Sequence, residues 1–354
     1  MEEPQTAPGR HRRPSHQARP GLLRLDARTL LSGLAPRPLA TPAEVSHLAG
    51  HRPGHAPRPA IGHSPASVVP GSTAWSIGAS GAAVAHGRVI ANIAYTRHGS
   101  HAEELDLYLP EGSPPPGGWP VVLAFPGGGW RHADRKDYGR AVSVLTQHGY
   151  AVAGVDYTYA DPRSAGPSWP TNLDDAREAV RWVRRNAPSF GFNPDKVVAM
   201  GESSGAHLAL LLGTDPAGSK PGEASARVDA VVDFYGPTDL ATLYAESRPA
   251  VLPYFDTFLG GPPSQDPGRY ADASPLSHVG PGSAPTLIVQ GLADRTVAPE
   301  QSIRLDAALT RAGVPHRFET IAWAGHGFRL DLGAFSFVPD IVGFLDGALG
   351  GRAY

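Results

Sequence analysis

Hydrophobic and polar residues follow two different patterns along the 354 residues of this chain. As far as residue 87, neither the period of a strand nor that of a helix persists. From Arg88 onward, short apolar runs alternate with longer amphipathic ones, which predicts β-strands alternating with α-helices. Such an alternation indicates an α/β fold in which helices cover both faces of a mostly parallel central sheet.

The individual runs predict where these elements lie. Residues 89–95 and 104–109 alternate apolar and polar side chains, which is typical of an opening antiparallel pair of strands. Further strands are expected at residues 121–125, 151–155, 196–200, 230–234, 286–290 and 317–321. Helices are expected at residues 136–147, 172–187, 301–312 and 339–349.

Residues 1–87 are dominated by Pro, Arg, His, Gly and Ala. A segment of this composition buries too little apolar surface to offset the entropy of ordering it, so we expect a disordered N-terminal tail. Its histidines are interpreted as compositional bias, because Pro53 prevents the helix that would align His51 and His55 on a metal ion. Residues 88–354 are expected to form one folded α/β domain.

One stretch of the tail, residues 22–32, has the sequence Leu-Leu-Arg-Leu-Asp-Ala-Arg-Thr-Leu-Leu-Ser. It lacks the continuous apolar core of a secretory signal. It resembles an export-associated motif found near the N-terminus of some bacterial proteins, and the alternative is a short amphipathic helix. We therefore expect an exported protein, secreted or in the cell envelope, with a cytoplasmic protein as the alternative.

Composition excludes several classes of function. The formal net charge of −2 gives no electrostatic case for binding nucleic acid or an anionic membrane surface. Cysteine is absent, so disulfides, thiol catalysis and thiolate metal sites are excluded. No apolar run reaches the roughly 18 residues of a membrane-spanning helix, so no membrane span is expected. The sequence does not indicate an oligomeric state.

The strongest chemical signal is the pentapeptide Gly-Glu-Ser-Ser-Gly at residues 201–205. A predicted buried strand precedes it and an apolar predicted helix follows it, which is the strand–turn–helix context of a nucleophile elbow. Such a turn holds its central residue in a strained conformation, and the flanking glycines remove side chains that would collide there. Ser203 is therefore the predicted nucleophile.

A serine hydroxyl needs a general base and an acid that orients the base. In α/β folds that carry a nucleophile elbow, the order along the chain is serine, then acid, then histidine. The acid and the histidine both follow later strands. Asp294 lies in the loop after the strand at residues 286–290 and is the predicted acid, with Asp239 as its rival.

His326 lies between two glycines just after the last predicted strand, and it is the predicted base. His316 opens that strand, and His278 precedes Asp294, which would reverse the expected order. His207, beside the elbow, is interpreted as a packed or hydrogen-bonded helix residue.

The tetrahedral intermediate of acyl transfer also requires hydrogen-bond donors for its oxyanion. The sequence Phe-Pro-Gly-Gly-Gly-Trp at residues 125–130 follows a predicted strand, where this fold places such donors. Consecutive glycines allow backbone N–H groups to turn toward a substrate, and the amide of Ser204 is expected to add a donor. A phosphate-binding loop is disfavoured because no Gly-Lys-Ser or Gly-Lys-Thr follows.

Together these motifs resemble α/β-hydrolase esterases of the hormone-sensitive-lipase type and of the bacterial acetylxylan and feruloyl esterase-like group. The resemblance extends from about residue 104 to residue 328. It rests on the motifs at residues 105–110, 127–130, 155–157, 201–209, 234–240 and 325–327.

The resemblance implies an α/β-hydrolase fold and a triad of Ser203, His326 and Asp294. It also implies that the amides of Gly128, Gly129 and Ser204 form the oxyanion hole, and it implies no cofactor and no metal.

The chain departs from the family pattern at three positions. Pro126 stands where the family usually has histidine before the three glycines, and Gln290 stands where histidine often precedes the acid loop. Ala206 stands where a second glycine often follows the serine motif. Because proline has no N–H and a fixed φ, Pro126 changes the backbone at the start of the loop in which the oxyanion hole is expected.

Two insertions are expected to shape the substrate pocket. Residues 160–170 bring Trp169, and residues 236–285, a predicted lid or wall, carry Tyr244, Tyr254, Phe255 and Phe258. The alternative is that these aromatic residues form a core of the insertion itself. With Trp130, they suggest a short or aromatic acyl group, and Trp130 and Trp169 are the predicted pocket residues.

The sequence therefore predicts a serine esterase of the carboxylesterase type. It acts through an acyl-enzyme on short-chain or aromatic acyl esters, either small molecules or esters linked to polysaccharide, such as acetylated or feruloylated carbohydrate. One alternative is an amidase or peptidase of the same fold. The other is a catalytically inactive hydrolase fold that serves as a binding module, an interpretation supported by Pro126 alone.

Overall fold

The structure is a computed structural model. It describes residues 22–23, 87–132, 134–136, 138–164, 166–214, 223–328 and 337–350; at residues 22, 23, 139, 140 and 338 only the backbone is described. Apart from Leu22, Leu23 and Gly87, the predicted N-terminal tail and its export-like motif lie outside the described residues.

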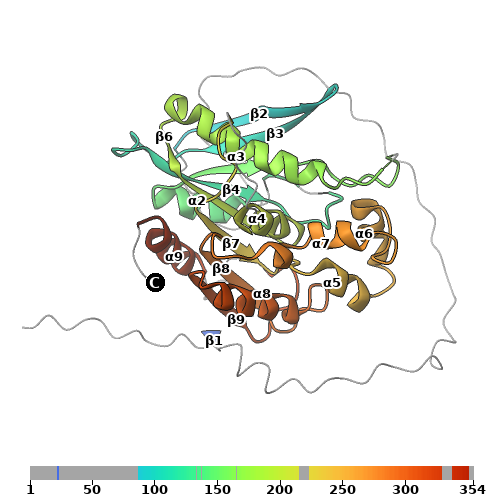
Figure 1. Ribbon diagram of the computed structural model, residues 1–354. Helices are drawn as coiled ribbons and strands as arrows, with labels where there is room; N and C mark the ends of the chain where they lie inside the picture. Colours follow the sequence, from blue (N-terminus) through green and yellow to red (C-terminus); the bar gives the residue numbers. More distant parts are fainter. Residues whose placement is uncertain are drawn as a thin grey trace, which may run out of the picture. The chain divides into compact units, whose positions relative to one another are not determined.

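Nine strands of the described residues form one sheet, in the order β1-β9-β8-β7-β6-β4-β5-β3-β2 (Figure 1). The pairs β5/β4, β4/β6, β6/β7, β7/β8 and β8/β9 are parallel, whereas β2/β3, β3/β5 and β1/β9 are antiparallel. The strands are β1 (Leu22–Leu23), β2 (Val89–His98), β3 (His101–Tyr108), β4 (Trp119–Phe125), β5 (Ala151–Val155), β6 (Phe192–Glu202), β7 (Ala230–Phe234), β8 (Thr286–Gly291) and β9 (His316–Ile321). The predicted α/β-hydrolase architecture is confirmed.

The order of the strands indicates which edge of the sheet is expected to bind a ligand. From β4 the chain passes to β5 on one side and then to β6 on the other side. In open α/β sheets, ligands bind beyond the carboxyl ends of the strands where the strand order reverses. The carboxyl ends of β4 and β6 are Phe125 and Glu202, which directly precede the glycine-rich loop and Ser203.

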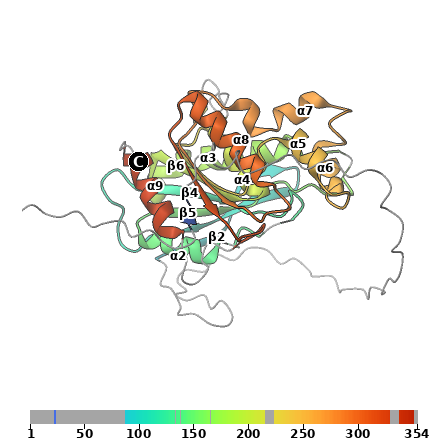
Figure 2. The ribbon, with the colours of Figure 1, turned by 90° about the horizontal axis from the view of Figure 1, so that it is seen from below.

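Helices cover the two faces of the sheet (Figure 2). Helices α2 (Gly139–Gln147) and α9 (Val338–Gly350) lie on one face, and α3 (Thr171–Phe190), α4 (Ser204–Thr214) and α8 (Pro299–Ala312) lie on the other. On the first face, fully buried strand residues such as Val122 and Leu287 pack in one cluster with Leu345 of α9. The alternation of side chains along each buried strand supplies both layers of the core.

Helix α4, which follows the elbow, is buried along its whole length. Its sequence is apolar on all sides, which is typical of a helix that is surrounded by the protein rather than lying on its surface. The residue that precedes it, Ser203, is therefore attached to one of the most enclosed elements of the domain.

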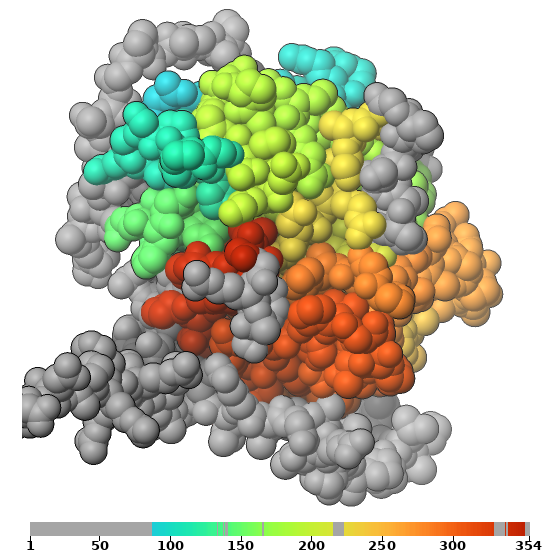
Figure 3. Space-filling model, turned by 60° about the vertical axis from the view of Figure 1, so that its left-hand side comes forward, coloured from blue at the N-terminus to red at the C-terminus, as the bar shows by residue number. Residues whose placement is uncertain are grey.

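Residues 236–285 contain helices α5 (Leu240–Glu246), α6 (Leu252–Leu259) and α7 (Pro267–Asp272) and a short 3₁₀ helix, η1 (Pro275–His278). Figure 3 shows α6 and α7, in light orange, projecting at one side of the surface. Helix α6 contacts the glycine-rich loop, because Phe258 stacks on Trp130 with ring centroids 4.4 Å apart. The insertion thus lies against the glycine-rich loop, at the carboxyl edge of the sheet.

Several predicted elements differ from the observed ones at their ends. Helix α2 begins at Gly139 rather than at residue 136, because the amide of Lys136 binds the carboxylate of Asp134 at 2.9 Å and forms a turn there. Strand β6 begins at Phe192 rather than at residue 196, because Phe192 pairs with Trp119 of β4.

Candidate active site

The backbone around Ser203 has the geometry of a sharp strand-to-helix turn. Strand β6 ends at Glu202 and helix α4 begins at Ser204, while Ser203 itself has φ 51°, a strained value for a residue with a side chain. A Cβ atom on Gly205 would lie 1.9 Å from the carbonyl oxygen of Phe125, and one on Gly201 would lie 2.3 Å from the backbone of Gly205. Both glycines are therefore required by close backbone approach.

The structure brings the three predicted triad residues together. The Oγ of Ser203 lies 2.9 Å from Nε2 of His326, and Nδ1 of His326 lies 2.7 Å from Oδ2 of Asp294. The three side chains come from the loops that follow β6, β9 and β8, at the carboxyl edge of the sheet. This is the connectivity that a serine nucleophile requires: hydroxyl, base and orienting acid in one chain of hydrogen bonds.

The surroundings of Asp294 determine which oxygen faces the histidine. Its Oδ1 accepts hydrogen bonds from the amides of Thr296 and Val297 at 2.8 and 3.0 Å, and its side chain is fully buried. Its Oδ2 is thereby directed to His326, whose Nδ1 must carry a proton to donate to it. The neutral imidazole then has its lone pair on Nε2, facing the hydroxyl of Ser203.

Tyr235 packs against the catalytic imidazole. Its ring meets that of His326 edge to face, with centroids 4.9 Å apart, and its hydroxyl donates to the carbonyl oxygen of Phe328 at 3.3 Å. Burial, together with the nearby Glu202, raises the pKa of Tyr235 far above its usual range, so it stays a neutral phenol. Tyr235 belongs to the motif at residues 234–240, but nothing in that motif indicated its contact with His326.

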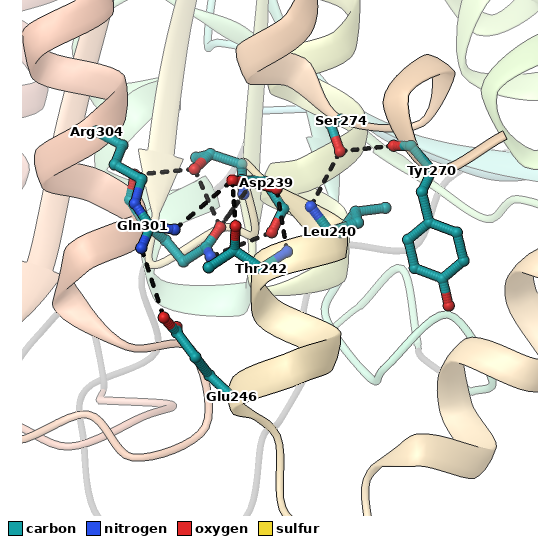
Figure 4. A network of polar contacts seen from close by, with 9 residues as sticks. Asp239, Leu240, Thr242, Glu246, Tyr270, Ser274, Gln301 and Arg304 are labelled. Atoms are coloured by element: carbon teal, nitrogen blue, oxygen red, sulfur yellow. Dashed lines mark hydrogen bonds and ion pairs between the residues drawn. The ribbon is translucent and has the colours of Figure 1, made fainter. Parts of the chain in front are cut away.

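The alternative acid, Asp239, and the alternative bases, His316 and His278, make contacts outside the triad. Asp239 caps helix α5 by accepting a hydrogen bond from the amide of Thr242 at 3.1 Å (Figure 4). His316 lies 3.1 Å from Asp306, whose hydrogen bond raises the pKa of that histidine. His278 is partly buried, and its Nε2 lies 2.7 Å from the backbone carbonyl oxygen of Asp272 in α7.

His207 joins three elements behind the elbow. It is 0% exposed, and its Nε2 donates to the carbonyl oxygen of Ala273 at 2.7 Å. Its Nδ1 therefore accepts the indole N–H of Trp130, at 3.2 Å. Burial lowers the pKa of His207 to about 4, so the ring is neutral near pH 7. It ties helix α4 to the glycine-rich loop and to the insertion.

The glycine-rich loop lies directly against the nucleophile. A Cβ atom on Gly127 would lie 3.3 Å from the Cβ of Ser203. Gly128 and Gly129 have φ values of 135° and 62°, and a Cβ on either would collide with the carbonyl oxygen of His132 or with the ring of Tyr254. These residues must be glycine for the loop to pass between the elbow and helix α6.

Ser204 supplies the other predicted donor. It is the first residue of α4, and the amides of the first helical turn have no partner within the helix. The predicted oxyanion donors, Gly128, Gly129 and Ser204, therefore belong to two segments that meet beside Ser203.

Two buried tyrosines hold the carbonyl groups at the start of this loop. The hydroxyl of Tyr138 donates to the carbonyl oxygen of Phe125 at 2.7 Å, and that of Tyr157 donates to the carbonyl oxygen of Pro126 at 3.0 Å. Because Pro126 has no N–H, its carbonyl is the one backbone group through which a hydrogen bond can fix it. The hydroxyl of Tyr157 also lies 3.4 Å from Oγ of Ser204, so it contacts both segments of the predicted hole.

The predicted pocket residues Trp130 and Trp169 are 4% and 8% exposed. Both rest on Phe258: Trp130 is stacked on it, and Trp169 meets it edge to face with centroids 5.9 Å apart. Both rings are thus used in packing, and they contribute to a filled aromatic wall beside the glycine-rich loop. The sequence left open whether the aromatic residues of the insertions line a pocket or pack together, because that depends on how α6 packs.

The described parts of the chain contain neither a metal-ligand cluster nor a membrane-spanning helix. There, no group of three or more His, Cys, Asp or Glu side chains is arranged to hold a metal ion. Within the same ranges, no helix combines the length and apolarity needed to cross a bilayer.

Comparison with known proteins identifies relatives of the chain. It is 29% identical to the probable carboxylic ester hydrolase LipM of Mycobacterium tuberculosis, over 60% of this chain and 49% of that protein. The acetyl ester-xyloside bifunctional hydrolase of Caldicellulosiruptor lactoaceticus is 25% identical, with a TM-score of 0.60 over 72% of this chain and 90% of its own. The esterase Est2 of Thermogutta terrifontis is 26% identical, with a TM-score of 0.61 over 74% and 93%.

The chain spans about half the length of the curated relatives it matches. The model of the BD-FAE family matches residues 105–309, a stretch that runs from the end of β3 to helix α8 and includes the elbow and the acid loop. Because this stretch is more than half of the chain, the protein belongs to the BD-FAE family.

Proposed function

We propose that this protein is a serine carboxylic-ester hydrolase that acts through an acyl-enzyme. The observation that carries the proposal is the continuous chain of hydrogen bonds from Ser203 through His326 to Asp294, which ends at a strained nucleophile elbow. Membership of the BD-FAE family and the likeness to a probable carboxylic ester hydrolase support it.

In the proposed mechanism, Ser203 attacks the ester carbonyl while Nε2 of His326 takes its proton. The imidazolium that forms is stabilised by the buried carboxylate of Asp294, and the oxyanion is stabilised by the amides of the glycine-rich loop and Ser204. His326 then gives its proton to the leaving alcohol. In the second half of the reaction it deprotonates a water molecule, which releases the acid and regenerates the serine.

We further propose that the acyl group is short or aromatic and that the alcohol is a carbohydrate. The wall formed by Trp130, Trp169 and Phe258 is filled by ring-on-ring packing, which favours a small acyl group over a long lipid chain. The structurally similar hydrolase of Caldicellulosiruptor lactoaceticus acts, according to its name, on acetyl esters and xylosides. Acetylated or feruloylated polysaccharide is therefore the proposed natural substrate.

Hydrolysis of p-nitrophenyl acetate, butyrate and octanoate by the native protein and by Ser203→Ala tests the proposal. The native protein should turn over the acetate and butyrate esters faster than the octanoate, and the variant should not exceed the background rate. Acetylxylan and methyl ferulate should then be compared as substrates. Equal rates for native protein and variant on every ester would refute the serine mechanism and would favour the binding-module alternative.

The amidase alternative has its own readout. The matched p-nitroanilides carry the same acyl groups on a poorer leaving group, so an esterase should hydrolyse them far more slowly than the esters. Comparable kcat/KM values for the ester and the anilide of one acyl group would favour an amidase.

We also propose that the protein is exported, on the resemblance of residues 22–32 to an export-associated motif. Fractionation of cells that produce the full chain, with and without these residues, provides the test. Retention of both forms in the cytoplasm would contradict the proposal.

A further inference from the structure

Gln290 is a fully buried polar residue near the end of strand β8, four positions before Asp294. The other residues of this strand are also buried, and three of them are aliphatic. A side-chain amide is unfavourable in such a place unless its donors and acceptor find partners. The partners of Gln290 are therefore informative about its role.

Three oxygens surround one end of the Gln290 amide. Its Nε2 lies 3.3 Å from Oδ2 of Asp294, 3.1 Å from the carbonyl oxygen of Gly291 and 3.4 Å from that of Val297. Because all three neighbours are acceptors, the atom that faces them must be the nitrogen. Gln290 thus donates toward the oxygen of Asp294 that also accepts from His326.

The other end of the amide is held by helix α8. The hydroxyl of the fully buried Ser302 donates to Oε1 of Gln290 at 2.9 Å. The preceding residue, Gln301, accepts the amides of Thr238 and Asp239 at 2.9 and 2.7 Å, as the network in Figure 4 shows in part. The first part of α8 is therefore anchored to the loop after β7, and Ser302, in that anchored part, holds the side chain of Gln290 in place.

We propose that Gln290, held by Ser302, is a positioning residue for the catalytic acid. It adds a second donor to Oδ2 and so limits the movement of the oxygen that the backbone amides direct toward His326. The two backbone amides hold only Oδ1, so without Gln290 the oxygen that faces the imidazole is held by the imidazole alone. This inference rests on the proposed serine mechanism.

The test uses Gln290→Met, which keeps the length of the side chain and removes both its donor and its acceptor. We expect kcat for p-nitrophenyl acetate to fall about tenfold with KM within about twofold, since a tenfold loss equals ~1.4 kcal/mol in the barrier, the scale of one hydrogen bond to a charged group. Ser302→Ala should lower kcat in the same direction by a smaller factor. The rate at which a fluorophosphonate labels Ser203, measured across pH, should fall in parallel.

Thr286→Val is the matched control. Thr286 lies on the same strand and is nearly fully buried, and its hydroxyl donates to the carbonyl oxygen of Ala284 at 3.0 Å rather than to the acid loop. This variant should lower the melting temperature without changing kcat or the labelling rate.

The outcomes separate this inference from the proposed function. If Gln290→Met melts at a lower temperature but keeps the native kcat, labelling rate and pH profile, Gln290 only stabilises the fold and the inference is wrong. If Gln290→Met does not fold, a native kcat in Ser302→Ala is enough to overturn it. A native protein that is folded but neither turns over esters nor labels at Ser203 contradicts the proposed function, and this inference falls with it.

Discussion

Asp294→Asn is the sharpest perturbation of the site, because the structure determines how the new side chain must sit. The amides of Thr296 and Val297 both donate to Oδ1 of Asp294, so the asparagine must place its carbonyl oxygen there. Its NH₂ group then occupies the position of Oδ2, 2.7 Å from Nδ1 of His326. A donor replaces an acceptor at the contact that sets the state of the imidazole.

The consequence is a change of tautomer. With a donor facing Nδ1, His326 must accept there and carry its proton on Nε2, the atom that lies 2.9 Å from the hydroxyl of Ser203. A protonated Nε2 cannot take the proton of the serine. We expect kcat to fall about 10⁴-fold, the effect of this exchange in another serine hydrolase triad, which corresponds to ~5 kcal/mol. KM should change little, because the acid does not touch the substrate.

Steady-state hydrolysis of p-nitrophenyl acetate measures both constants, and Asp239→Asn is the matched control. Asp239 was the rival acid, but it caps helix α5, and asparagine caps a helix about as well as aspartate. The control should retain kcat within about twofold. If Asp294→Asn kept more than about a tenth of the native kcat, or if Asp239→Asn lost as much as Asp294→Asn, the assignment of the acid would be refuted.

Three further predictions follow from individual contacts. Tyr157→Phe removes the hydroxyl that holds the carbonyl of Pro126, so kcat should fall about tenfold at constant KM. This loss is smaller than the roughly 10²–10³-fold loss of kcat when a whole oxyanion donor is removed. Steady-state hydrolysis of p-nitrophenyl acetate measures both constants. Gly205→Ala places a Cβ atom 1.9 Å from the carbonyl oxygen of Phe125, so fluorophosphonate labelling of the serine should be abolished. Burial raises the pKa of Asp233 to about 7, so the folding stability that its protonated form contributes is fully present below about pH 4 and is lost as pH rises through 7. Asp233→Asn should therefore raise the melting temperature at pH 8, and this increase should shrink toward pH 4.

Much of the fold and the triad could be predicted because the signals are local. The elbow is five consecutive residues whose glycines are required by contacts within the turn or with the adjacent strand β4. The buried parallel strands are short apolar runs, and the order of Ser203, Asp294 and His326 along the chain follows from the order of the loops. None of these inferences needed knowledge of which distant side chains touch.

The supporting contacts could not be predicted, because they join residues far apart in sequence and leave no periodic pattern. Tyr157 and Pro126 are 31 positions apart. The partners of Gln290 lie both in the loop that follows its strand and in helix α8. Trp130 was predicted to be a pocket residue, but the sequence did not show that Phe258 of the insertion stacks on it and buries its ring. The exposure of an aromatic side chain depends on its neighbours, and the sequence does not specify them.

The contacts of Pro126 bear directly on the binding-module alternative, which rested on that residue alone. A proline at the start of the glycine-rich loop lacks the N–H through which another residue could be tied to its surroundings. Here the hydroxyl of Tyr157 holds the carbonyl of Pro126 instead, and it also approaches Ser204, which contributes the other predicted donor. The loop and the elbow thus share one buried anchor, so proline at this position is compatible with an ordered oxyanion hole and gives no reason to expect an inactive protein.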